Sequence, residues 1–442
     1  MKPSRRWLRA DVLLLGVALL VRGGVVFYVR SYAHPEEYEF SLIARNWLAG
    51  RGYSLTWGVI GPQDPLYREG SWSFGPLVLY PERVYPDYPL RRLTLPTALM
   101  APGVVFAMVP FLALFPDRPY LFYQLFVGAL TALIPLFLLD IGRRMGYGRA
   151  GWLAGWAAAL YPELAYSVTT LTDAPWTALG WTVLLWCAVR WVQRPERSRA
   201  VGLGLAMGGF ALFNPSTVAY FPLILLLGIG RNREKRVLIG SLVALAISLA
   251  VLSPWLVRNA CVLGAPVLRT AWGLNLLRGN HPGATGMAYY PPDRREITTY
   301  SLEQRRGWTR LPLQEREIDR RLAQEAWSFI RHHPDQYLTL SLRRLLAFWT
   351  VVPHHPLSRE PAYWLPHAVL IPGLVAGYVV LGATSAGWIL LGAPIYTTLL
   401  YSATIVLPRY RTGIVPVLLF IASVGYQALL RRLLLKRGGR DL

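Results

Sequence analysis

The sequence has little charge and few cysteines. Charged side chains make up 16% of its 442 residues and apolar side chains 54%, whereas a soluble domain carries about 25% charged residues. The apolar residues fall into many separate runs, which excludes a secreted protein, a disordered chain and a coiled coil. Two cysteines, Cys187 and Cys261, give neither a disulfide framework nor a CxxC metal site. The composition therefore indicates a polytopic membrane protein.

Many of the apolar runs are candidates for crossing a membrane, since a spanning helix needs about 20 mostly apolar residues. Two long polar stretches, 31–93 and 257–364, interrupt them. The short residue series Asn214-Pro215-Ser216 joins two of the runs and predicts a tight hairpin there. The runs cover residues 12–29, 95–115, 120–139, 151–171, 174–192, 201–213, 217–229, 237–254, 365–383, 387–406 and 411–429.

The placement of the basic residues predicts the topology. Five short segments carry 20 basic and four acidic residues: 1–10, 140–150, 190–200, 230–236 and 430–442. The two long polar stretches together are much closer to balance, with 21 basic and 16 acidic residues. Because cytoplasmic loops hold the excess of Lys and Arg, we place the five segments inside and the two long stretches outside. The net charge of +22 thus reflects topology rather than binding of nucleic acid.

The number of crossings depends on the run 95–115, which three prolines interrupt. If this run crossed the membrane, the basic segment 140–150 would lie outside. We therefore predict a re-entrant or outer-surface segment, and an all-α protein of about ten transmembrane helices with both termini in the cytoplasm. The expected parts are an N-terminal transmembrane module, 1–256, with outer loop 31–93 and re-entrant segment 95–115, an outer region, 257–364, with a small outer domain, and C-terminal transmembrane helices with a basic tail, 365–442.

The first outer loop starts with an acidic helix. Pro35 at a first helical position, acids in the first turn and Gly50 at the end are helix start and stop signals. These signals predict a helix over 35–50.

One acid of this helix shares a stripe with apolar residues. Glu36, Phe40, Ile43 and Trp47 follow helical spacing, and an apolar stripe on an outer helix should lie on the membrane domain. At the mouth of a membrane cavity, Glu36 could act as a general base. The alternative is that the acids of this turn, including Glu37 and Glu39, only complement the helix dipole.

Five groups of short sequence motifs, spread over most of the chain, occur together in one protein family. They are Glu36-x-x-Glu39-Phe40-x-x-Ile43-Ala44-Arg45-Asn46-x-Leu48-x-Gly50-x-Gly52-Tyr53-Ser54, Tyr161-Pro162 with Thr172-Asp173, Pro254-Trp255 with Arg258-Asn259, Gly273-Leu274-Asn275-Leu276 with Gly279-Asn280-x-Pro282-x-Ala284-Thr285-Gly286, and Arg409-Tyr410-Arg411 with Pro416. The set resembles bacterial GT-C glycosyltransferases, which depend on lipid-phosphate sugars and are related to protein O-mannosyltransferases and aminoarabinose transferases. Two positions depart from that family, which usually has Asp at Glu36 and commonly Arg-Pro at Asn214-Pro215.

The resemblance implies a GT-C-like helix bundle that transfers a hexose or pentose from a polyprenyl phosphate, with inversion, to an extracytoplasmic hydroxyl of a protein, lipid or glycan. The chain has no GxxxxGK[ST] motif for a nucleotide, and the resemblance requires no cofactor, although Glu36 and Asp173 could share a divalent metal. The implied catalytic acids are Glu36, Asp173, Glu37 and Glu39. The implied substrate-binding residues are Arg409, Arg411, Arg258, Arg22, Tyr410 and Asn280, because arginine can bind two phosphate oxygens at once.

Each of these residues also has a structural alternative. Asp173 could cap the helix that follows it, and Arg22 could extend along its span to the interface. The other arginines could anchor the membrane surface, and the loop of Asn280 could be a simple turn-rich segment. The pairs His332-His333 and His354-His355 lack the ligands that would complete a zinc pattern.

Two other functions remain open at this level. A lipid or polysaccharide transporter would also have many spans, but transporters commonly show repeated halves and broken helices at the midplane, and the sequence has no evident repeat. An inactive GT-C relative that acts in assembly would account for the departures at Glu36 and Asn214.

Overall fold

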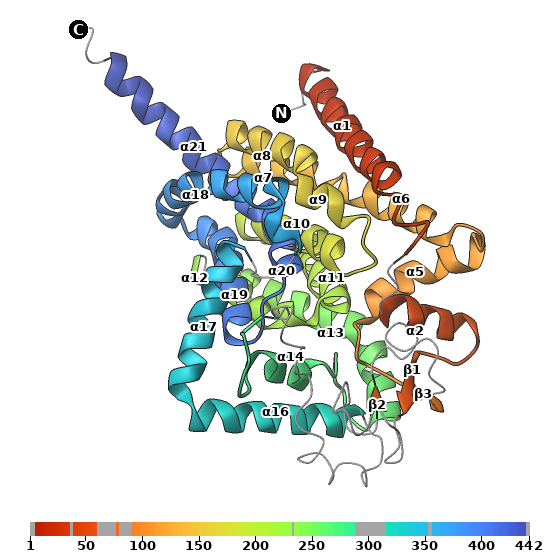
Figure 1. Cartoon of the computed structure of the whole chain (residues 1–442). Helices are drawn as coiled ribbons and strands as arrows, with labels where there is room; N and C mark the ends of the chain where they lie inside the picture. Colours follow the sequence, from red (N-terminus) through yellow and green to blue (C-terminus); the bar gives the residue numbers. More distant parts are fainter. Residues whose placement is uncertain are drawn as a thin grey trace.

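Helices make up most of the chain. The computed structural model describes residues 5–35, 39–59, 77–78, 91–231, 234–287, 315–351 and 356–438, and Figure 1 shows a helical bundle with a small sheet at one end. The elements of the first part are α1 (Arg5–Val29), α2 (Glu39–Leu48), β1 (Ser54–Val59), β2 (Leu77–Val78), β3 (Arg91–Pro96), α5 (Pro102–Leu114), α6 (Pro119–Thr131), α7 (Ile134–Arg144), α8 (Gly148–Leu160), α9 (Pro162–Ser167) and α10 (Ala174–Gln193). Those of the second part are α11 (Arg197–Phe213), η1 (Pro215–Tyr220), α12 (Phe221–Arg231), α13 (Lys235–Leu263), α14 (Trp272–Gly279), α16 (Glu315–His332), α17 (Pro334–Trp349), η3 (Pro356–Arg359), α18 (Pro361–Gly382), α19 (Ser385–Ala403), α20 (Pro408–Thr412) and α21 (Val415–Gly438).

The fold is that of a mostly helical membrane protein. Within the described residues, five helical segments are long and apolar enough to cross a membrane: Ala10–Val29, Pro119–Arg144, Lys235–Leu263, Pro361–Gly382 and Val415–Leu434. The count of about ten spans therefore stays a prediction. Other apolar runs form shorter or broken helices.

Two of the expected elements differ from the structure. The run 151–171 divides into α8 and α9, because Pro162 disfavours a helical conformation at Tyr161, whose ψ is 118°. The break at Asn214 is present, but α11 packs mainly on α13 and not on α12, so the two runs do not form the predicted tight hairpin.

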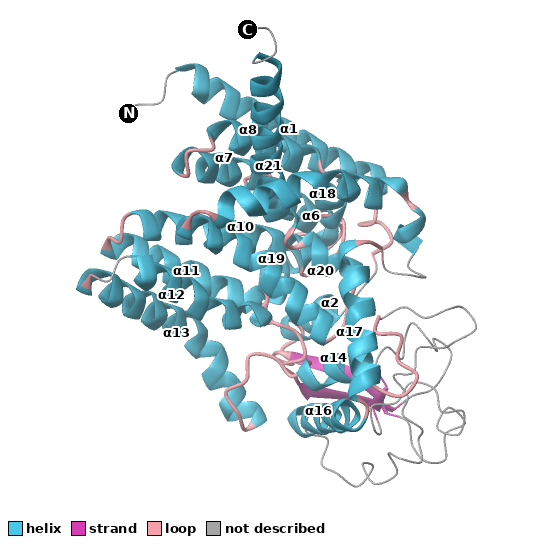
Figure 2. Ribbon diagram, turned by 90° about the vertical axis from the view of Figure 1, so that its left-hand side faces the viewer, coloured by secondary structure: helices cyan, strands magenta, loops and turns pink. Residues whose placement is uncertain are grey.

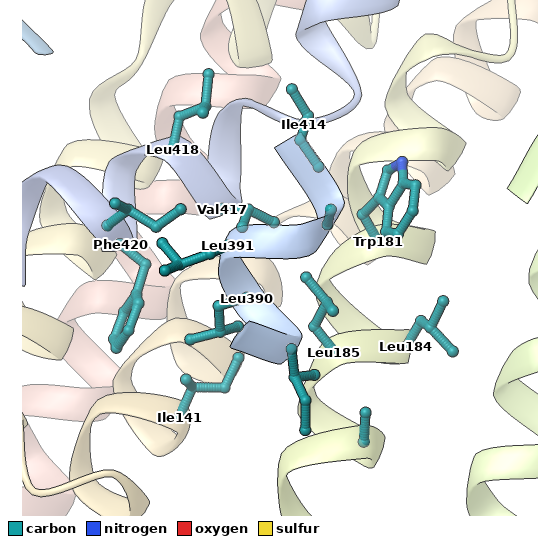
Figure 3. Close-up of a cluster of buried hydrophobic side chains, with 14 of the residues drawn as sticks. Ile141, Trp181, Leu184, Leu185, Leu390, Leu391, Ile414, Val417, Leu418 and Phe420 are labelled. Atoms are coloured by element: carbon teal, nitrogen blue, oxygen red, sulfur yellow. The ribbon is translucent and has the colours of Figure 1, made fainter. Parts of the chain in front are cut away.

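The centre of the bundle is an apolar core shared by helices that are distant in sequence. Figure 3 shows side chains from α7, α10, α19 and α21 meeting there. Trp181 and Leu185 of α10, Leu391 of α19 and Leu418 of α21 all belong to this core, and all four are almost fully buried. This core fixes α10 and α19, whose outer ends carry residues of the candidate site.

The two termini lie together at one end of the bundle, and the sheet lies at the other (Figures 1 and 2). The sheet has the antiparallel order β2-β1-β3. Helix α16 runs beside it, and Asp319 of α16 accepts hydrogen bonds from the backbone N–H groups of Gly273 (2.7 Å) and Leu274 (3.3 Å) at the start of α14. The sheet comes from residues 54–96, and α14 and α16 come from the region 257–364. The small outer domain predicted for 257–364, and the side of the membrane on which it lies, stay predictions.

The described part of the acidic helix of the first outer loop is α2, which runs from Glu39 to Leu48; its predicted start at Glu36 and Glu37 lies outside the described residues. Phe40 and Ile43 are buried, whereas Trp47 is 42% exposed and contacts the ring of Phe106 in α5 at 5.1 Å. The apolar stripe thus packs on α5, which has 13 residues and a length of about 20 Å. Such a helix is too short to cross the roughly 30 Å of hydrocarbon; the re-entrant assignment of 95–115 stays a prediction.

Candidate active site

The segment that leads to Glu36 lies against the segment that leads to Asp173. Helix α1 ends where Arg30 adopts a left-handed conformation, with φ 53°. Ser31 Oγ then donates a hydrogen bond to the carbonyl of Thr169 (2.7 Å). Gln124 Nε2 in α6 donates to both Ser31 Oγ (3.0 Å) and the Thr169 carbonyl (2.9 Å). The side chains of Ser31 and Gln124 thus join the first outer loop to the second.

Glu36 and Glu37 lie outside the described residues, so their roles stay predictions. Glu39 is the first residue of α2 and has interaction partners of its own. The structure therefore places the start of the acidic loop, but not its proposed base.

Asp173 stands at the start of α10, at the N-cap position. Its side chain is half-buried and makes no capping hydrogen bond; the capping alternative therefore does not describe what this carboxylate does. Its charge reaches Tyr123 of α6 and Tyr401 of α19, and α10 contacts both of these helices.

The surroundings of Asp173 are aromatic and hydrogen-bonded. Trp176 Nε1 donates to Tyr123 Oη (2.9 Å). Asn214 Nδ2 lies 3.4 Å from Thr177 Oγ1, and Thr177 Oγ1 in turn donates to the Asp173 carbonyl (2.9 Å). Asn214 therefore connects the break after α11 to the first turn of α10. This contact is a structural role for the asparagine that stands where the family commonly has arginine.

Helix α20 places the two predicted phosphate-binding arginines on different sides. Arg409 is exposed, with its guanidinium 5.9 Å from the ring of Tyr410, and Tyr410 stacks on Tyr401 at 4.3 Å. Arg411 is only 2% exposed. Residues two apart on a helix point about 200° apart, so the structure does not bring the two guanidinium groups together.

Arg22 is also buried, at 1% exposure, and binds the backbone of neighbouring helices. Its guanidinium donates to the carbonyls of Ala18, Ala158 and Ala159, and to Thr131 Oγ1. Arg22 neither extends to the interface nor pairs with a carboxylate among the described residues. It joins α1 to α6 and α8.

Arg258 and Asn280 have comparable structural contacts at the outer end. Arg258 donates to the carbonyls of Thr97 and Tyr53, each at 2.7 Å. Asn280 is fully buried and accepts a hydrogen bond from Arg344 Nη2 (3.1 Å). These contacts hold the segments around Thr97 and Gly279; Asn280 is fully buried, whereas Arg258 is partly exposed.

Three polar residues of this region carry no role in the sequence-based set. Gln124 joins the two outer loops, Glu163 is a buried acid in α9, and Arg344 is a buried cation that holds the Gly279 and Ser402 carbonyls. Glu163 directly follows the Tyr161-Pro162 motif, which was a usable signal. Nothing in the local sequence separates Gln124 or Arg344 from surface residues of helices.

Two cavities lie near these elements. One of about 320 Å³ is lined by Trp349, Thr350, Trp364, His367 and neighbouring residues at the outer end of α18. The other, of about 240 Å³, has Glu315 and Arg316 of α16 in its wall. Asp173 lines neither of them.

The described part of the chain contains no cluster of three or more His, Cys, Asp or Glu side chains that could hold a metal ion. Because Glu36 lies outside that part, a divalent metal shared by Glu36 and Asp173 stays a prediction.

The comparison with known proteins gives a fold. No protein-family model and no curated protein sequence matches the chain. Among solved structures, the oligosaccharyltransferase AglB from Archaeoglobus fulgidus, solved with an inhibitory peptide and a dolichol-phosphate, is similar over 99% of this chain and 52% of its own, with a TM-score of 0.52 and 13% identity. The chain shares the fold of this oligosaccharyltransferase over nearly all of its own length.

The two proteins share a fold but have little sequence identity. The chain spans about half the length of the oligosaccharyltransferase, and at this identity the likeness shows the fold and not the reaction. ArnT from Cupriavidus metallidurans, solved with undecaprenyl phosphate, is similar over 96% of this chain and 79% of its own at 17% identity, but a TM-score of 0.40 is too low to carry an argument.

Proposed function

We propose that the protein is a membrane glycosyltransferase that moves a sugar from a polyprenyl-phosphate donor to a hydroxyl acceptor on the outer face of the cytoplasmic membrane, with inversion. The observation that carries the proposal is the joint of Ser31, Gln124 and Thr169, which brings two acid-bearing outer loops together in a GT-C fold. The similar oligosaccharyltransferase was solved with dolichol-phosphate, which supports a polyprenyl phosphate as the carrier.

The proposed reaction needs a base and a cation. The acceptor oxygen forms a bond to the anomeric carbon while the bond from that carbon to the phosphate oxygen breaks. The acceptor proton passes to a carboxylate, and the polyprenyl phosphate leaves with the electron pair of the broken bond. Glu36 is the proposed base, and the half-buried Asp173 orients the acceptor hydroxyl or a metal that Glu36 and Asp173 share.

Arg409 is the proposed cation for the departing phosphate. It is exposed and lies beside Tyr410, which stacks on Tyr401 next to Asp173. A guanidinium at this place would stabilise the negative charge that develops on the leaving group. Arg411, Arg22, Arg258 and Asn280 are buried or bound to carbonyls, and we assign them to the support of this region.

Replacing the proposed base tests the function. The enzyme is purified, reconstituted in liposomes and supplied with a panel of polyprenyl-phosphate sugars and hydroxyl acceptors. We expect Glu36→Gln to lower kcat by about 100-fold or more, because loss of a general base costs about 10²–10⁴-fold. Glu37→Gln and Glu39→Gln separate the three neighbouring acids, and we expect both to retain most of the activity.

The controls separate a wrong assignment of the base from a wrong assignment of the reaction. Glu317→Gln removes an acid on α16 that pairs with Arg321 at 3.0 Å and should leave transfer unchanged. Full transfer by Glu36→Gln would remove the assignment of the base. If the wild-type protein transfers sugar from no lipid donor and instead moves lipid-linked sugar across the liposome membrane, the transporter alternative replaces the proposal.

A further inference from the structure

Five polar side chains from three elements and one turn meet inside the bundle. They are Tyr161 between α8 and α9, Glu163 in α9, Tyr363 and His367 in α18, and Arg411 in α20, and they are called the Arg411 cluster here. Each is at most 8% exposed. The charge of Arg411 acts on each of the other four, so Arg411 is the centre of the cluster.

The cluster holds α20 on two sides. On one side, Thr412 Oγ1 donates a hydrogen bond to Glu163 Oε1 (2.5 Å). On the other, Arg411 Nη1 donates to the carbonyls of Thr350 (2.7 Å) and Phe348 (3.3 Å), at the end of α17. The guanidinium also lies 4.8 Å from the ring of Tyr363. Two consecutive residues of a short helix are thereby tied to α9, α17 and α18.

Glu163 and Arg411 are the acid and the cation of the cluster, and the Arg411 charge favours the ionised carboxylate of Glu163, whereas its burial opposes that form. Arg411 Nε and Nη2 and Glu163 Oε2 are buried without a hydrogen-bond partner. A charged group buried with unused hydrogen-bonding atoms is costly, and an opposite charge nearby offsets much of that cost. Removal of either residue alone therefore leaves the other charge uncompensated, whereas removal of both does not.

The opposite side of α20 faces the candidate active site. Helix α20 has five residues, so the direction of residues 411 and 412 also sets the direction of 409 and 410. Tyr410 stacks on Tyr401. A Cβ atom at position 413, where the chain has glycine, would collide with Thr177 in the first turn of α10. In Figure 1, α20 lies centrally beside α10, α17 and α19.

We propose that Glu163 and Arg411 are positioning residues: the hydrogen bond between Thr412 and Glu163 and those from Arg411 to the end of α17 hold α20 so that Arg409 and Tyr410 face the donor phosphate beside Asp173. The part that concerns the donor rests on the proposed glycosyl transfer. The part that concerns α20 is a property of the fold and has its own measurement.

The experiment uses a double-mutant cycle of Glu163→Gln, Arg411→Gln and the two combined. We expect each single variant to raise the KM for the polyprenyl-phosphate sugar by about 10-fold to 100-fold, since a small displacement away from the chemistry can cost up to about 10²-fold. The KM for the acceptor should change little. The combined variant should be less impaired than the product of the two single effects, because no charge is left unbalanced.

A spin label at position 409 measures the position of α20 without any reaction. Arg409→Cys is made in full-length protein that also carries Cys187→Ala and Cys261→Ala, which removes both native cysteines. We expect an immobilised nitroxide spectrum, and a mobile one when Glu163→Gln or Arg411→Gln is added. Thermal unfolding of each variant in detergent shows that it is folded.

A matched control removes an acid from another pair of opposite charges between helices. Asp11→Asn breaks the pair of Asp11 in α1 with Arg143 in α7, whose atoms are 2.9 Å apart, and should change neither the donor KM nor the label at 409. Unchanged mobility in both folded single variants would overturn the positioning of α20. Changed mobility with an unchanged donor KM would overturn its link to the donor. Absence of transfer by the wild type would overturn the proposed function, while the spin label still decides the role of the pair.

Discussion

Asp319 couples the docking of the outer helix α16 to pH. Burial, together with the nearby Glu315 charge, raises its pKa from 3.8 to about 7, against the N–H groups of Leu274 and Gly273 and the charge of Arg269, which lower it. Burial also raises the pKa of Glu315, against hydrogen bonds from Thr270, Thr97 and Ala98 and the charge of Arg258. A carboxyl with a raised folded-state pKa gives stability that is full at low pH and is lost as the pH rises through that pKa.

We therefore expect α16 to be more stably docked at pH 5 than at pH 8. Hydrogen exchange of the α16 amides, corrected for the intrinsic pH effect, should be slower by roughly tenfold or more at pH 5, since one pKa unit corresponds to a factor of ten. Asp319→Asn should remove much of this difference. Glu317 is a partly exposed acid on the same helix, and Glu317→Gln should leave the difference unchanged. Faster corrected exchange at pH 5 would contradict the assignment.

The sequence shows the positions of the arginines along the chain, but it does not show which groups their side chains bind in the folded protein. Arg22 and Arg258 bind carbonyls of segments more than 100 residues away, so no local pattern separates them from a phosphate ligand such as the proposed Arg409. Asp173 was predictable because it stands two residues before Pro175 at the start of an apolar run. The burial of Arg411 was not, since it depends on α9, α17 and α18 meeting around α20.

At the scale of elements, proline residues interrupt helices, and glycine residues allow two helices to approach each other closely. Pro162 separates α8 from α9, so an apolar run that is long enough to span as one helix becomes two. Helices α18 and α21 pack closely through small residues, as membrane helices often do. A Cβ at Gly425 of α21 would collide with the backbone of Gly373 in α18. Hydropathy predicts such helices, but it does not predict which of them touch.

Gly425→Val should separate α18 from α21. We expect a loss of about 1–3 kcal/mol, the range for forcing extra methyl groups into a close-packed site, measured as a lower unfolding temperature in detergent. Gly23→Ala in α1 is the matched control, because a Cβ there meets nothing within 4 Å, and it should be neutral or slightly stabilising. Equal unfolding temperatures for Gly425→Val and the wild type would show that the helices do not meet at this glycine.

At the scale of the whole molecule, the fold separates the same two groups of segments that the charge distribution separates. The termini, with their basic residues, lie at one end of the bundle, and the sheet with α14 and α16 lies at the other (Figure 1). The predicted topology requires this separation, because segments 1–10 and 430–442 are inside and 31–93 and 257–364 outside. The number of spans was less predictable, since only five described helical segments have the length and apolarity to cross.

Labelling of Cys261 tests which end faces outward. Cys261 is exposed near the end of α13, close to the outer region, whereas Cys187 is half-buried within α10. In right-side-out membrane vesicles, we expect a membrane-impermeant maleimide to label Cys261 without permeabilisation, because the excess of basic residues holds the opposite end in the cytoplasm. Arg432→Cys in a Cys261→Ala background, on the exposed end of α21, should react only after permeabilisation. The reverse pattern would place the outer domain and Asp173 in the cytoplasm, and with them the proposed site of sugar transfer.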